Sequence, residues 1–155
     1  MPKIDISQVQ VQKGAGRYPK QFRSPFAGRE KQALGNAAGL TQFGVNLMRL
    51  KPGAMSALRH WHEQEDEFVY VLEGEITLIE DKDETLLRAG EAAGFQGGVA
   101  GGHHFVNRSQ GDAVFLVVGH RSPQERIHYS DDDLVYDYDG TSYTFTRKSG
   151  EPYLD

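Results

Sequence analysis

The hydrophobic and polar positions of the chain repeat mostly with a period of two, which is typical of β-strands. In one such run, Phe68, Tyr70 and Leu72 lie on one face of the predicted strand, and the valines between them lie on the other. Runs of this kind predict strands at residues 43–50, 56–62, 67–73, 75–80, 84–88, 103–107, 113–119, 134–138 and 142–147.

Dipeptides that end in glycine separate many of these runs: Pro52-Gly53, Glu73-Gly74, Ala89-Gly90, Gly97-Gly98, Gln110-Gly111 and Asp139-Gly140. Many short strands at close spacing with glycine-rich turns favour a sandwich or a barrel. The last hairpin is the clearest, because tyrosines alternate into Asp139-Gly140, a dipeptide suited to positive φ, and Tyr143 and Phe145 alternate out of it.

The sequence favours one short helix, near Arg29–Leu34, which is composed of good helix formers and is ended by Gly35. The polar residues 120–133 are expected to form a loop before the last hairpin. We therefore predict a single all-β domain with an N-terminal arm packed on the barrel at residues 1–40, a barrel core at 41–120 and a C-terminal loop and hairpin at 121–155.

The composition excludes several classes of function. The 155 residues include 17 Lys+Arg and 22 Asp+Glu, a formal net charge of −5, which argues against nucleic-acid binding. The longest apolar run, residues 113–118, is far shorter than the roughly 20 residues of a membrane span. The N-terminus lacks the apolar core of a signal peptide, so we expect a cytoplasmic protein with no membrane partner.

Histidines and one glutamate form the strongest chemical pattern. His60 and His62 are two residues apart, so both imidazoles leave the same face of a strand, and a short turn would bring Glu67 back beside them. His103 and His104 face opposite ways, so only one can point inward; we choose His103, whereas a bulge would select His104. Because the chain has no cysteine, any metal must be held by nitrogen and oxygen.

These residues stand in two motifs that resemble those of the cupin family. The first, with the pattern Gly, His-x-His, Glu, Gly, spans Gly53–Gly74 and contains both histidines and Glu67. The second spans Gly90–Asn107, with Gln96 in place of the usual proline and a spacer before His103 that is two residues longer than the common form. The resemblance implies a double-stranded β-helix, or jelly-roll, barrel with a metal held by His60, His62, Glu67 and His103.

The resemblance also implies one divalent transition-metal ion, such as Zn, Mn, Fe or Ni, in a chain similar to sugar-phosphate isomerase-like cupins. Such an ion would either polarise a carbonyl or hydroxyl group, as in isomerases and lyases of small sugar-like or keto compounds, or bind oxygen and substrate together, as in dioxygenases. A non-catalytic protein that binds a small ligand is the third alternative. The ligand set does not decide between them, and no catalytic residue is assigned.

The remaining expectations concern the residues around the predicted ligands and the oligomeric state. Glu63, Glu65 and Asp66 are expected to form a solvated turn, and no interior carboxylate or lysine other than Glu67 stands out as a general base. A homodimer is expected, because the sheet edges of such barrels are often covered by a partner strand. Residues that share strand faces with the ligands are expected to line the pocket: Ser56, Leu58, Val69, Val71, Phe105 and Asn107.

Overall fold

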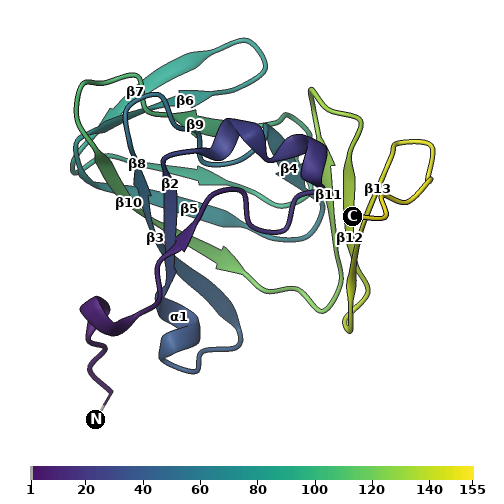
Figure 1. The fold of residues 1–155 in the computed structure, drawn as a ribbon, viewed down its shortest axis with the longest axis horizontal. Helices are drawn as coiled ribbons and strands as arrows, with labels where there is room; N and C mark the ends of the chain where they lie inside the picture. The colour runs from purple at the N-terminus through teal and green to yellow at the C-terminus, as the bar shows by residue number, and fades with distance from the viewer. Residues whose placement is uncertain (1) are drawn as a thin grey trace.

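A computed structural model describes residues 2–155, which form three antiparallel sheets (Figure 1). The largest sheet has the order β1-β2-β3-β10-β5-β8 and consists of Gln12–Lys13, Arg29–Ala33, Phe43–Leu50, Ala113–His120, Glu67–Glu73 and Ala92–Phe95. The second sheet, β7-β6-β9, consists of Glu84–Arg88, Glu75–Ile79 and His104–Val106. The third sheet, β13-β12-β11-β4, consists of Tyr143–Thr146, Val135–Tyr138, Glu125–Tyr129 and His60–His62.

The two smaller sheets meet where β4 runs past the start of β9. The backbone amide of His60 donates to the carbonyl of His103 at 3.1 Å, and the amide of His103 donates to the carbonyl of His60 at 2.9 Å. This bridge joins the two sheets into one wall, and it fixes the two histidines side by side. The site described below is therefore positioned by backbone hydrogen bonds.

The main core lies between the six-stranded and the three-stranded sheets, where side chains from β3, β5, β6, β7, β9 and β10 pack together. Along β5 the predicted period of two is confirmed: Val69 and Val71 are fully buried, whereas Phe68, Tyr70 and Leu72 are exposed on the outer face. The resulting architecture is the all-β, jelly-roll-type barrel that the sequence predicts.

The N-terminal segment packs on the C-terminal sheet. It carries three 3₁₀ turns, and in Figure 1 it crosses from β2 to β11 and back. The Tyr18 ring lies 5.2 Å from that of Phe26 and 5.7 Å from that of Tyr129, in a second apolar cluster that also includes Leu58 and Leu134. The bounds of the turns are η1 Ile6–Gln8, η2 Lys20–Phe22 and η3 Ser24–Phe26.

The helix predicted near Arg29–Leu34 is wrong. Arg29–Ala33 forms β2, which pairs along its whole length with β3, and the short helix α1 is Leu34–Ala37. Pairing with β3 satisfies the backbone groups of β2 that face that strand, and such tertiary context overrides a weak helix propensity. None of the helices in residues 2–155 has the length and apolar character needed to cross a bilayer.

The prediction of a loop at residues 120–133 is also wrong for the middle of this segment, which forms β11. This strand pairs with β12 on one side and with β4 on the other, so it connects the C-terminal hairpin to the strand that contains His60 and His62. The hairpin itself is confirmed, with Tyr136 opposite Phe145 and with Gly140 at φ 99° in the turn. Strands β1 and β8 were not predicted, because their residues lack the alternation of apolar side chains.

Candidate metal centre

Three potential ligands converge where β4 turns into β5. His60 and His62 project from the same face of β4, and Glu67 is the first residue of β5. One ligand atom of each of the three side chains lies within 4.8 Å of the other two. The His-x-His parity and the short turn therefore bring together the residues that the sequence singled out.

The structure places His103 beside this trio and His104 away from it. His103 is 2% exposed, and its Nε2 lies 3.1 Å from Glu67 Oε1. Its ring centroid is 4.9 Å from that of His60, and Phe95 stacks on it at 3.5 Å. His104 points to the opposite side, where its Nδ1 donates to the carbonyl of Ala57 at 2.8 Å. The bridge between His103 and His60 sets this register.

His60 and Glu67 are in the protonation states that a cation requires. Because a carbonyl only accepts hydrogen bonds, His60 Nδ1, 2.7 Å from the Leu58 carbonyl, carries the proton and leaves Nε2 with a free lone pair. Burial, with help from His62, lowers the pKa of His60 to about 3. Burial raises the pKa of Glu67, but His103 and His62 outweigh it and hold that pKa below its usual range. At neutral pH the pair is a neutral imidazole and a carboxylate.

The surroundings of His62 test whether these residues fit a bound metal ion. Both of its ring nitrogens are buried, and neither has a hydrogen-bond partner among residues 2–155. Its Nε2 is 3.4 Å from Glu67 Oε2, and its Nδ1 is 3.4 Å from Glu125 Oε2. Burial lowers the pKa of His62, but Glu125 and Glu67 more than offset it and raise the pKa to about 9. Buried imidazole nitrogens normally have partners, so this donor set fits a divalent transition metal, which would take the place of the proton on Nε2.

Glu125 on β11 belongs to the site, although the sequence analysis missed it. Its side chain is 3% exposed, and it accepts hydrogen bonds from the backbone amides of Gln64 at 3.0 Å, Glu65 at 3.0 Å and Arg126 at 2.8 Å. It thus ties the turn between β4 and β5 to β11, and its carboxylate lies beside His62 Nδ1 while His62 Nε2 faces Glu67. The alternation of Glu125, Ile127 and Tyr129 was the signal that could have revealed it.

The turn at residues 63–66 was expected to be solvated, but its carboxylates accept hydrogen bonds from other parts of the chain. Glu63 accepts from His128 Nε2 at 2.7 Å, Glu65 accepts from the Ser122 amide at 2.8 Å, and Asp66 accepts from the Gly97 amide at 2.8 Å. The turn lies between β11 and the loop that follows β8, so its carboxylates find donors on both sides.

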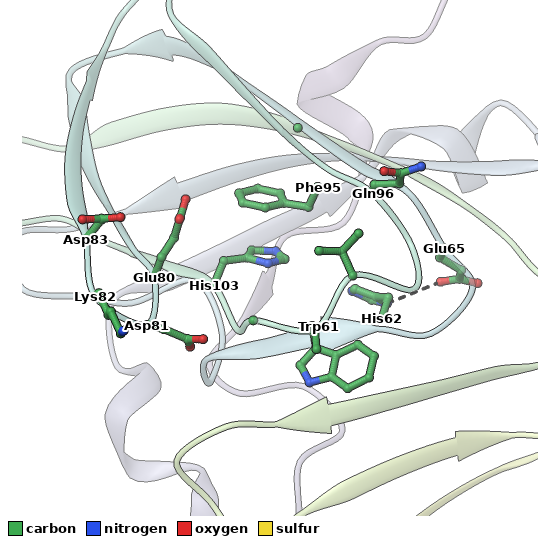
Figure 2. Close-up of a pocket in the computed structure, with 14 residues that line it drawn as sticks. Trp61, His62, Glu65, Glu80, Asp81, Lys82, Asp83, Phe95, Gln96 and His103 are labelled. Atoms are coloured by element: carbon green, nitrogen blue, oxygen red, sulfur yellow. Dashed lines mark ion pairs between the residues drawn. The ribbon is translucent and has the colours of Figure 1, made fainter.

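A cavity of about 570 Å³ opens beside the histidines (Figure 2). His62 and His103 line it together with Trp61, Phe95 and the acidic loop between β6 and β7. Glu65 borders it from the side of the β4–β5 turn, and Figure 2 shows its ion pair with His62, whose Nδ1 is 3.9 Å away. A small molecule in this cavity would meet two of the four predicted ligands.

None of the six residues predicted to line the pocket lines this cavity. Val69, Val71 and Phe105 belong to the main core, and Leu58 belongs to the second cluster. Ser56 accepts from the Phe105 amide at 3.0 Å, and the buried Asn107 side chain donates to the carbonyls of Leu50 and Gly111, both at 2.8 Å. These residues share strand faces with the ligands, and those faces pack into the interior of the protein. The cavity, in contrast, is built mainly from loops.

Comparisons with known proteins agree with this architecture. The family described as Cupin domain matches residues 46–119. A structure from Silicibacter pomeroyi, described as a sugar phosphate isomerase from a cupin superfamily, is 45% identical, with a TM-score of 0.93 over 99% of this chain and 97% of that chain. A candidate sugar phosphate isomerase from Acidithiobacillus ferrooxidans is 29% identical, with a TM-score of 0.73 over 82% and 81% of the two chains.

A more distant structure shares the fold alone. The polyketide cyclase RemF from Streptomyces resistomycificus is 24% identical, with a TM-score of 0.63 over 86% of this chain and 89% of that chain. A search of curated proteins finds no match. The identity of 45% over nearly the whole length, together with the fold, shows that the chain belongs to the cupin superfamily.

Proposed function

We propose that the chain is a metal-dependent isomerase or lyase that acts on a small sugar-like or keto compound. The observation that carries the proposal is the convergence of two histidines and a partly buried carboxylate within 4.8 Å, with His103 3.1 Å from the same carboxylate. The two relatives at 45% and 29% identity, whose descriptions name sugar phosphate isomerase, support it. The ligands of one divalent transition ion, Zn, Mn, Fe or Ni, would be His60, His62, Glu67 and His103.

When bound, such an ion supplies a Lewis acid that polarises a carbonyl or hydroxyl oxygen and eases loss of a proton at the neighbouring carbon. The chain must then hold and move that proton. Glu65 is placed for this task, because its carboxylate borders the cavity beside His62 and is held by the Ser122 amide. Burial raises the pKa of Glu65, which brings the carboxylate closer to the range of an effective acid and base.

Metal analysis of the full chain purified from its own host tests the ligand set. We expect about one equivalent of a transition metal, lost in His60→Ala and in Glu67→Ala. His104→Ala is the matched control, because His104 faces away from the trio and bonds to Ala57. Retention of the metal by the first two variants, or its loss in the control, would contradict the proposed ligands.

Isotope exchange tests the reaction class. In deuterated water, the metal-loaded chain is expected to incorporate deuterium at a substrate carbon during turnover of a panel of sugar-like and keto compounds. Turnover that consumes oxygen and requires iron would indicate a dioxygenase instead. Binding without any turnover would indicate a non-catalytic binding protein. Glu65→Gln is expected to keep the metal and to lose the exchange, because the amide cannot accept the proton.

The homodimer expected from the sequence is part of the same proposal. The outer face of the six-stranded sheet exposes four large apolar side chains, and an apolar patch of this kind is typical of an interface. Their exposed fractions lie between 38% and 47%, and they come from β3 and β5: Phe43, Phe68, Tyr70 and Leu72. We infer that a second copy of the chain covers this face.

A further inference from the structure

The wall of the cavity beside the histidines is strongly acidic. Four carboxylates line it, and the only lysine or arginine that lines it within residues 2–155 is Lys82. In Figure 2 the loop between β6 and β7 gathers its acidic side chains on one side of His103, and Glu65 lies beyond His62 on the other side. The acidic residues of that loop are Glu80, Asp81 and Asp83.

The imidazole of His62 faces the carboxylates of Glu67 and Glu125, each at 3.4 Å, and the other cations near the cavity are already paired or lie elsewhere. Arg59 is bound between Asp81 and Asp131, with its Nη2 2.8 Å from Asp131 Oδ1, and its side chain is 14% exposed. These hydrogen bonds raise the pKa of the Arg59 guanidinium. Arg49 pairs with Asp112 at 3.3 Å, and neither residue lines the cavity. In the described part of the chain, no arginine is therefore free to bind an anion in the cavity.

Several backbone amides at the rim are also in use. The Gly97 amide donates to Asp66 at 2.8 Å, and the Gly98 amide donates to the carbonyl of His62 at 2.8 Å. In the acidic loop the amide of Glu80 donates to the carbonyl of Asp83 at 2.9 Å. Free amides in glycine-rich loops are the usual cradle for phosphate, and these three are not free.

The electrostatic consequence follows from the size of the cavity. A space of about 570 Å³ is roughly 10 Å across, similar to the Debye length of about 8 Å at physiological ionic strength. Each lining charge therefore acts on any group inside the cavity. For a phosphate dianion about 8 Å away, each carboxylate should weaken binding about two- to fivefold, after screening by solvent and salt.

We propose that the substrate of the isomerase or lyase suggested above is an uncharged hydroxylated or keto compound, and that the cavity excludes phosphate esters. This inference rests on the proposed function and narrows its substrate class. Carboxylates on both sides of the cavity accept hydrogen bonds from hydroxyl groups, while Phe95 offers apolar surface to a sugar ring. The descriptions of the two relatives name a sugar phosphate, whereas the substrate proposed for this chain has no phosphate group.

Binding of inorganic phosphate to the full chain, measured by calorimetry at low and physiological salt, tests the inference. Wild type is expected to bind phosphate more weakly than about 1 mM, the upper end of common KM values. The double variant Glu80→Gln/Asp83→Asn should bind it about tenfold more tightly than wild type. Both side chains are exposed, and neither is used in a hydrogen bond among residues 2–155, so the variant should fold.

The matched control is Glu73→Gln/Asp155→Asn, which removes the same charge away from the cavity and should leave phosphate binding unchanged. Phosphate binding by wild type tighter than about 1 mM that weakens as salt rises would overturn the inference, because it reveals an attractive site. Turnover of a sugar phosphate, but not of the free sugar, by the metal-loaded chain would also overturn it.

The two proposals can fail separately. Metal content measured on the same samples tests the proposed function, since a chain that binds no transition metal is not the enzyme described above. Phosphate exclusion is measured on the metal-free chain, because a bound divalent ion would itself attract the anion. A metal-free cavity that repels phosphate supports the inference whatever the metal analysis shows.

Discussion

Replacement of Glu125 by glutamine separates the positioning of His62 from the support of the surrounding turn. In the structure, one carboxylate oxygen accepts from the Gln64 and Arg126 amides, and the other accepts from Glu65 and faces His62 Nδ1 at 3.4 Å. An amide has one oxygen, so in either orientation its NH₂ group meets at least one backbone N–H. The substitution is nearly isosteric and therefore changes hydrogen bonding more than packing.

The magnitude follows from the contacts that are lost. A hydrogen bond to a charged group contributes about 1.5–3 kcal/mol, and the buried side chain leaves little solvent to replace it. If the amide oxygen keeps the Gln64 and Arg126 bonds, the loss of the Glu65 bond and of the His62 ion pair should lower the free energy of unfolding by about 2–4 kcal/mol. Because His62 is no longer held with Nε2 toward Glu67, metal affinity should fall about 10- to 100-fold.

Urea unfolding measures the first quantity, and zinc competition with a chromophoric chelator measures the second. Glu65→Gln is the control, because Glu65 lies near the same His62 nitrogen, at 3.9 Å, but accepts one backbone amide only. We expect the control to bind zinc almost as wild type does. Wild-type zinc affinity in Glu125→Gln, or an equal loss in both variants, would refute the positioning of His62 by Glu125.

Three further predictions address the turn, the sheet face and the pH dependence. In Gly97→Ala the new Cβ would lie 2.5 Å from the Gln64 carbonyl, so unfolding experiments should show a loss of about 1–3 kcal/mol, whereas Gly111→Ala, which meets no atom within 4 Å, should be neutral. Leu72→Asp should convert the dimer to a monomer in light scattering, and Leu86→Asp, equally exposed but on β7, should not; a wild-type monomer would disprove the interface. Burial opposes ionisation of Glu125, but its bonds to His62 and to backbone amides lower its pKa, so its contribution to stability is present above about pH 4.5 and is lost as pH falls through the lowered value. Chemical unfolding as a function of pH should therefore show a smaller loss in acid for Glu125→Gln than for wild type, and parallel curves would contradict this assignment.

The strands and the spacing of the histidines follow from local rules. Alternation along β5 and the Asp139-Gly140 hairpin depend on neighbouring residues, and such patterns are readable without the fold. The parity of His60 and His62 is equally local, because two residues that are two apart on a strand share a face whatever surrounds them. The cupin motifs added the choice of Glu67 among four acidic residues of the turn.

Contacts between distant parts of the chain were decided by the tertiary structure. Helix propensity at Arg29–Ala33 gave way to pairing with β3, and the role of Glu125 depends on Gln64, which is 61 residues earlier. The choice of His103 over His104 is set by its backbone bridge to His60 across the sheet junction. The acidic cavity is assembled from loops whose order in the sequence does not reveal that they meet. Periodicity describes which side chains share a face, but which faces meet is a property of sheet packing, and the chemistry of the site depends on both.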